Sequence, residues 1–183
     1  MANSAIIMAY VGVALMVGLA GIASAIGTAI CGQAAVGAMK KNGGAFGSYM
    51  VLSALPGSQG LYGFVCFFMV TNLYPLVGPA ITPAQGAAVL GIGLLVGMVN
   101  LLAAVYQGKV CASGIAAIGN GHDVMGKTLI LAAFPELYAI LTVAATYLIA
   151  SVAISWGAPE VVEAVAPVAE AAAEVAAEVA PAL

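Results

Sequence analysis

Residues 124–156 read VMGKTLILAAFPELYAILTVAATYLIASVAISW, and this stretch decides the fold. A helix needs about 20 apolar residues to cross the roughly 30 Å of hydrocarbon in a bilayer, and this stretch is longer than that. Its one carboxylate, Glu136, lies far from both ends. The stretch therefore predicts a membrane-spanning helix with a single carboxylate inside it.

Three further apolar stretches, at 6–38, 47–73 and 84–118, have the same character. Only 6% of the 183 residues are charged and 64% are hydrophobic, whereas about 25% of the residues in a soluble domain are charged. Such a chain cannot cover a surface that faces water. We therefore predict an all-α, multi-pass integral membrane protein with four transmembrane helices. The first stretch lacks a positively charged leader region, so we interpret it as a retained helix rather than a signal peptide.

The chain repeats itself with an offset of 79 residues, which aligns Gly12 with Gly91 and Pro56 with Pro135. The pattern Leu-x-Ala-x-Pro at 52–56 recurs at 131–135. Proline inside a helix is costly, so its recurrence favours duplication over chance. We predict two helical hairpins, 1–78 and 79–156. In this alignment Glu136 falls opposite Gly57, so only the second hairpin has the acid.

Small residues recur at four-residue spacing along 6–38, and such rows let helices approach closely in lipid. Two interpretations stay open, ordinary packing within one chain and a ring of identical copies, and the length of the rows favours the ring. One row consists of Ala20, Ser24, Thr28 and Gly32.

Charge is distributed unevenly along the chain. The four basic residues are lysines, at 40, 41, 109 and 127, and the positive-inside rule then predicts that the connections at 40–46 and 119–127 are cytoplasmic and both termini outside. Five of the seven acids lie in the Ala/Val/Glu-rich tail 157–183, which we expect to be disordered and to which we assign no function. No basic stripe suggests nucleic acid. The cysteines Cys31, Cys66 and Cys111 are expected to be small packing residues.

Glu136 is the strongest functional signal, because an ionisable residue inside a membrane helix indicates a functional site by default. Polar partners lie at suitable positions in the other helices. Gln107 offers an amide from 84–118. In 47–73 a set of residues shares one helical face by its i, i+3, i+4, i+7 spacing, namely Leu55, Ser58, Gln59 and Tyr62.

One carboxylate among several neutral oxygens suits a hard monovalent cation. A site for protons needs only the carboxyl group and perhaps one hydrogen bond. A plainer interpretation, in which Gln59 and Gln107 only link helices, also stays open. No Walker A loop, catalytic triad, nucleophile motif or Cys/His metal spacing occurs. We therefore expect a protein that binds an ion.

These residues resemble the proteolipid of the membrane rotor in V-type and A-type ATPases, known as the K or c subunit. The resemblance covers about residues 4–156. It rests on the duplicated four-helix layout, on the Gly-Gln-Ala-Ala run at 32–35, on the Leu-Pro-Gly-Ser-Gln-Gly-Leu-Tyr run at 55–62, and on Glu136. The run at 55–62 is similar to that of bacterial sodium-pumping members, in which a Thr often stands at the position of Ser58.

The resemblance implies a homo-oligomeric ring in a bacterial inner membrane, rotating against a stator subunit and attached to a central-stalk subunit. It implies that each chain carries Na⁺, and that Tyr62 hydrogen-bonds the carboxylate. Two alternatives stay open, the same rotor carrying H⁺ and a small four-helix channel or transporter without an ATPase. No organic cofactor is implied. The resemblance also implies that the chain is not itself catalytic, because ATP hydrolysis occurs in a separate soluble head. The implied sodium ligands are Glu136, Gln59, Gln107, Ser58 and the carbonyl of Leu55.

Overall fold

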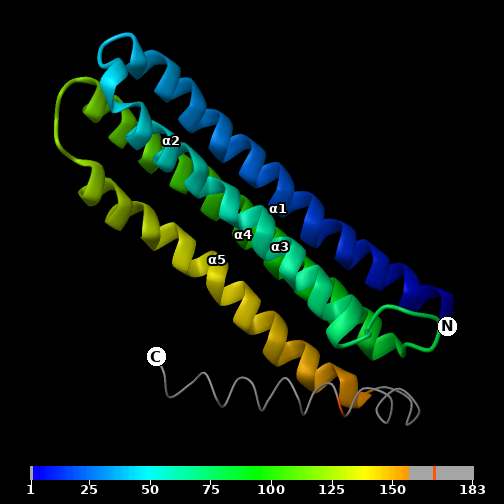
Figure 1. Ribbon diagram of the computed structural model, residues 1–183. Coiled ribbons are helices and arrows are strands. Elements are labelled where there is room, and N and C mark those ends of the chain that lie inside the picture. The colour runs from blue at the N-terminus through cyan, green and yellow to red at the C-terminus, as the bar shows by residue number, and fades with distance from the viewer. Residues whose placement is uncertain (1, 157–166, 168–183) are drawn as a thin grey trace, which may run out of the picture.

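The computed structural model describes residues 2–156 and 167. Within them the chain forms four long helical spans, each apolar and long enough to cross a membrane. Figure 1 shows the spans running side by side as one elongated bundle. This confirms the prediction of an all-α fold with four spans. The predicted tail 157–183 lies, except for residue 167, outside the described residues.

The first hairpin contains α1 and a second span that is not one regular helix. Helix α1 is Ala2–Met39. After a 3-10 turn at Gly43–Ala45, the second span consists of α2 (Phe46–Ala54), a 3-10 turn (Leu55–Gly57), α3 (Ser58–Phe68) and a π-helical turn (Met69–Leu73). Pro56 sits in the 3-10 turn, where its missing N–H interrupts the α-helical hydrogen bonding. The second span therefore changes its winding just before Ser58 and Gln59.

The second hairpin consists of α4 (Pro83–Gly119) and α5 (Met125–Ala153), with a 3-10 turn at Ile154–Trp156. Thr82 caps α4 with a capping box. The backbone N–H of Gln85 donates to the Thr82 hydroxyl, and the backbone N–H of Thr82 donates to the Gln85 side-chain oxygen. The Gln85 amide also donates to the Ala153 carbonyl at 3.3 Å, which fastens the start of α4 to the end of α5. Helix α5 continues through Pro135 without a break.

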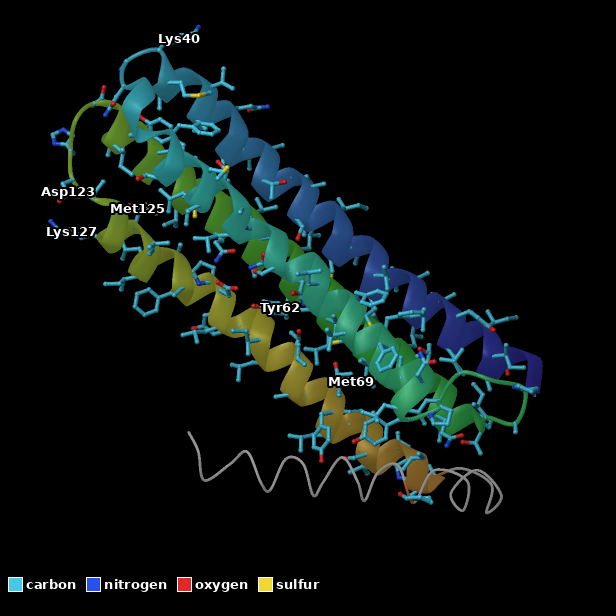
Figure 2. The ribbon with its side chains drawn as sticks, in the orientation of Figure 1. Lys40, Tyr62, Met69, Asp123, Met125 and Lys127 are labelled. Carbon is cyan, nitrogen blue, oxygen red and sulfur yellow. The ribbon has the colours of Figure 1, made fainter. Side chains whose placement is uncertain are left out.

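The two ends of the bundle differ in their side chains. We call the end with the connections 40–45 and 120–124 the lysine end, where Figure 2 places Lys40, Asp123 and Lys127. We call the other end, with the connection 74–82, the proline end. At the lysine end the Lys41 ammonium donates to the Asn120 side chain at 2.8 Å and links the two connections.

Helices α1 and α4 pack closely against each other, because small residues line their contact. A Cβ added to Gly27 would lie 2.6 Å from the Ala104 carbonyl oxygen, and one added to Gly108 would lie 2.7 Å from the Gly27 carbonyl oxygen. Near the proline end, a Cβ on Gly93 would collide with the Gly12 backbone. Cys31, Cys66 and Cys111 are buried with free thiols, and Cys31 lies in this contact, its thiol donating to the Gly108 carbonyl at 3.2 Å.

The close contact generates the first prediction. Gly93→Ala should lower the free energy of unfolding by about 1–3 kcal/mol, the usual cost of overpacking, because the facing atoms are backbone and cannot turn away. The measurement is the thermal unfolding midpoint of the purified protein in detergent. Gly37→Ala on α1 is the matched control, since a Cβ there meets nothing within 4 Å. Equal midpoints for the two variants would contradict this account of the α1–α4 contact.

Candidate ion-binding site

Glu136 lies on α5, about midway along the bundle, and each of its carboxylate oxygens accepts a hydrogen bond from another helix. The Tyr62 hydroxyl on α3 donates to Oε1 at 2.8 Å. The Gln107 amide on α4 donates to Oε2 at 3.0 Å. Figure 2 places Tyr62 near the middle of the bundle, between the two ends. The acid is therefore held by neutral donors and not by a basic side chain.

Gln59 extends this network by one link. Its amide nitrogen donates to the Gln107 side-chain oxygen at 2.8 Å, and both glutamines are completely buried. Gln59 and Tyr62 lie three residues apart on α3 and so share a face. The structure thus brings together four of the six predicted residues, Glu136, Tyr62, Gln107 and Gln59, in a continuous hydrogen-bonded chain.

The amide oxygen of Gln59 is buried and accepts no hydrogen bond within the described residues. A buried acceptor without a partner costs about 1–3 kcal/mol. Because the Gln59 nitrogen donates to the Gln107 side-chain oxygen, the Gln59 oxygen is left as an acceptor that a cation or a water molecule could use. This orphaned oxygen is the feature of the site that fits an additional ligand.

Ser58 and Leu55 lie beside Glu136 in an open groove, which we call the carboxylate groove. It has a volume of about 610 Å³ and runs between the second span and α5. The Ser58 hydroxyl donates to the Leu55 carbonyl oxygen at 3.0 Å, so these two predicted ligands are bonded to each other. A serine hydroxyl can rotate and still offer a lone pair. The groove is lined by Val51, Ala54, Leu55, Gly57, Ser58, Leu61 and Glu136.

Two polar contacts near the site were not predicted from the sequence. The Gln107 nitrogen also donates to the Ala132 carbonyl at 2.9 Å, one turn before Glu136. Farther toward the proline end, the buried Asn100 donates to the Thr142 hydroxyl at 3.1 Å and links α4 to α5. The contact between Asn100 and Thr142 could have been suspected, because an asparagine inside an apolar stretch needs a polar partner. The contact with Ala132 could not, because every residue has a backbone carbonyl and the sequence does not mark which one accepts.

No cluster of three or more His, Cys, Asp or Glu side chains that could hold a metal ion exists within residues 2–156 and 167. A cation at Glu136 would therefore depend on one carboxylate and on neutral oxygens. The fold and the site together define a class: a multi-pass membrane protein made of two helical hairpins, with the carboxylate of Glu136 held between them.

The family model for the C subunit of ATP synthase matches residues 11–70 and again residues 90–149. The two matches begin 79 residues apart, in agreement with the repeat found in the sequence. The chain belongs to this family, as a membrane rotor proteolipid of the V-type and A-type ATPases. It moves ions as part of a multisubunit rotary ring and is not itself catalytic. Both predictions, the family and the lack of catalysis, are confirmed.

Two curated relatives agree with this assignment. The chain is 33% identical over 135 residues to the A-type ATP synthase subunit K of Methanocaldococcus jannaschii, covering 74% of this chain and 58% of that protein. It is 33% identical over 147 residues to the V-type sodium ATPase subunit K of Enterococcus hirae, covering 80% of this chain and 92% of that protein. Membership of this family supports the rotor subunit over the alternative hypothesis of a small channel or transporter acting without an ATPase.

The hydrogen bond from Tyr62 generates the second prediction. Tyr62→Phe should speed the modification of Glu136 by dicyclohexylcarbodiimide several-fold or more, because a hydrogen bond to a charged group contributes about 1.5–3 kcal/mol and its loss frees the carboxyl group to react. Tyr138→Phe is the control, since Tyr138 is 66% exposed on α5. The rate is followed by mass spectrometry. Unchanged rates in Tyr62→Phe would show that this bond does not restrain Glu136.

Proposed function

We propose that each chain of this rotor carries one Na⁺ ion, bound at Glu136. The observation that supports this proposal best is the buried Gln59 oxygen without a donor, in a side chain that Gln107 links to a carboxylate whose two oxygens each accept one neutral hydrogen bond. Neutral oxygens around a single negative charge suit a hard monovalent cation. The printed name of the Enterococcus hirae relative, a sodium ATPase subunit, agrees with this choice of ion.

The proposed ligands are Glu136 and the oxygens of residues on three other elements, while Tyr62 orients the carboxylate. Gln107 contributes its side-chain oxygen, which at present accepts from Gln59. Ser58 and Leu55 contribute a hydroxyl and a carbonyl from the carboxylate groove. The full ligand set is Glu136, Gln59, Gln107, Ser58 and Leu55.

Rotation supplies the transport step in this proposal. A bare carboxylate facing lipid is costly, so Glu136 leaves the stator only after an ion has cancelled its charge. When rotation brings the loaded site back to the stator, a cationic side chain of the stator competes for the carboxylate and releases the ion on the other side of the membrane. The ring is attached to a central stalk that transmits torque from the soluble ATPase head.

The lysine end faces the cytoplasm in this proposal and the proline end faces outward, in a bacterial inner membrane. The lysines at the ends of the spans and connections support this orientation through the positive-inside rule. We retain 1–78 and 79–156 as the two hairpin units. Because Gly57 stands where the second hairpin has Glu136, we propose one ion for each chain.

The third prediction concerns the charge itself. Glu136→Gln should abolish ATP-driven Na⁺ uptake by vesicles that contain the whole ATPase, because a neutral amide cannot bind and release the ion by changing its charge. The ring should still assemble, as measured by the mass of the detergent-solubilised complex. Asp123→Asn is the matched control, since Asp123 lies in an exposed connection. Normal uptake by Glu136→Gln would remove this residue from the mechanism.

The fourth prediction tests which ion is bound. Na⁺ should protect Glu136 from dicyclohexylcarbodiimide, and the half-protective concentration should rise as the pH falls, because protons compete for the same carboxylate. Gln59→Leu should raise that concentration roughly 10-fold or more, which follows from a loss of about 1–3 kcal/mol. Gln33→Leu, at an exposed position of α1, is the control.

Two outcomes would contradict different parts of the proposal. Modification that is insensitive to Na⁺ at every pH would overturn the sodium assignment and favour the same rotor carrying H⁺. Protection that is normal in Gln59→Leu would keep the sodium assignment and remove Gln59 from the ligand set.

A further inference from the structure

A second buried acceptor without a donor lies outside the ion-binding site, on the proline-end side of Glu136. Asn100 of α4 is completely buried. Its amide nitrogen donates to the Val96 carbonyl at 2.8 Å and to the Thr142 hydroxyl at 3.1 Å. Its amide oxygen, Oδ1, is also buried and accepts no hydrogen bond in the part of the chain that the structure describes. Asn100 therefore has its donors bonded and its acceptor unpaired.

Turning the Asn100 amide over would not satisfy this oxygen. With nitrogen and oxygen exchanged, Oδ1 would face the Val96 carbonyl oxygen, and two acceptors would meet. The Thr142 hydroxyl has a single proton, which it donates to the Ala139 carbonyl at 2.6 Å. The neighbours therefore fix the present orientation, and the missing donor has to come from outside this group of side chains.

Small side chains lie beside the amide, on the side that faces the level of Glu136. Ala103 lies one turn from Asn100 along α4, and Ala139 lies one turn from Thr142 along α5, both of them buried. Alanine methyl groups fill little of the space between two helices whose distance is set by larger side chains one turn away. A buried water needs a roomy, polar place of this kind, with about two to four polar partners.

The first hairpin closes the same level without polar side chains. The offset of 79 residues relates Asn100 to Gly21, and it relates Thr142 to Gly63. A Cβ added to Gly63 would lie 2.5 Å from the Ala20 Cβ, so the second span packs directly against α1 there. The two hairpins therefore close one level in two ways, by the close approach of a glycine in the first and by an amide and a hydroxyl in the second.

We propose that Asn100 and Thr142 bind one buried water molecule, which completes the contact between α4 and α5 on the proline-end side of Glu136. The water donates to Asn100 Oδ1 and to the lone pair that the Thr142 hydroxyl keeps after accepting from Asn100. Holding one water in place costs little, whereas an unpaired buried acceptor keeps its full desolvation penalty. This water site is separate from the ion-binding site and is independent of which ion the rotor carries.

The chemistry of the site selects water over a cation. Asn100, Thr142 and the backbone groups bonded to them are neutral, and an isolated charge is far more costly to bury than a polar molecule. Glu136 lies about 9 Å from the level of Thr142, at a rise of about 1.5 Å per residue along α5. Its two oxygens already accept from Tyr62 and Gln107. The acid of the ion-binding site is therefore not placed to neutralise a cation at Asn100.

The water gives α5 a link to α4 on each side of Glu136. On the lysine-end side, Gln107 donates to an α5 carbonyl at 2.9 Å. On the proline-end side, the hydrated contact of Asn100 with Thr142 holds the same two helices. Because Pro135 removes one N–H donor from α5, links on both sides of the proline keep Glu136 in register with its own donors.

The fifth prediction is a water peak beside Asn100. A high-resolution crystallographic or cryo-electron-microscopy map of the assembled rotor should show density about 2.5–3.0 Å from Oδ1, the usual length of a hydrogen bond between two oxygens. The peak should persist when choline replaces Na⁺ in every buffer. A peak that disappears with Na⁺ would identify a cation. Either that result, or no peak in a map that shows other buried waters, would overturn the proposal.

Two substitutions at Thr142 supply the matched comparison. Thr142→Val keeps the shape of the side chain and removes the hydroxyl, so the peak beside Asn100 should be lost. Thr142→Ser keeps the hydroxyl and should keep the peak. A peak that remains in Thr142→Val, or that is lost from both variants, would contradict the proposed partners. A rotor that pumps ions normally and has no water at Asn100 would refute this site and leave the rotor function intact.

Discussion

An ionisable carboxylate inside the membrane span is the constraint on which the rest of the structure depends. Glu136 can be charged there only if neighbouring groups stabilise it, because lipid offers neither water nor counter-ions. The protein supplies donors from two other helices, Tyr62 and Gln107. A fixed basic side chain would neutralise the acid permanently, whereas neutral donors leave its charge uncompensated and its remaining lone pairs available. The dependence on neutral donors explains why Gln107, and Gln59 bonded to it, are completely buried in so apolar a bundle.

Duplication gives one hairpin the membrane-embedded acid and the other a structural role. At the level where α5 has Glu136, the first hairpin has Gly57, whose carbonyl accepts from the Ser24 hydroxyl at 3.3 Å. That hydroxyl also accepts from the Gly60 N–H at 2.7 Å. At the position equivalent to Glu136, the first hairpin therefore has hydrogen bonds that fasten the second span to α1. Because α3 is fixed in this way, Gln59 and Tyr62 are held in position to meet Glu136 across the bundle.

Hydrophobicity and the spacing of the loops predicted the four spans, because the thickness of the hydrocarbon layer sets the minimum length of a transmembrane helix. Glu136 was predictable as the one acid inside a span, and Gln59 and Tyr62 as residues on one face of a helix. The Ala132 acceptor and the Leu55–Ser58 hydrogen bond were not predictable, because they depend on local winding near Pro56 and on which helix faces meet. The link from Asn100 to Thr142 has the same origin.

The described hydrogen bonds to Glu136 all come from side chains of its own chain. The acid is held where the two hairpins meet, and there Gly27 and Gly108 bring α1 and α4 into backbone contact and so fix Gln107 relative to α3. Donors divided between two copies of a rotating ring would separate whenever the copies shifted. With these donors on one chain, the geometry around the carboxylate is independent of such shifts, while the carboxylate groove leaves the acid open to the surface.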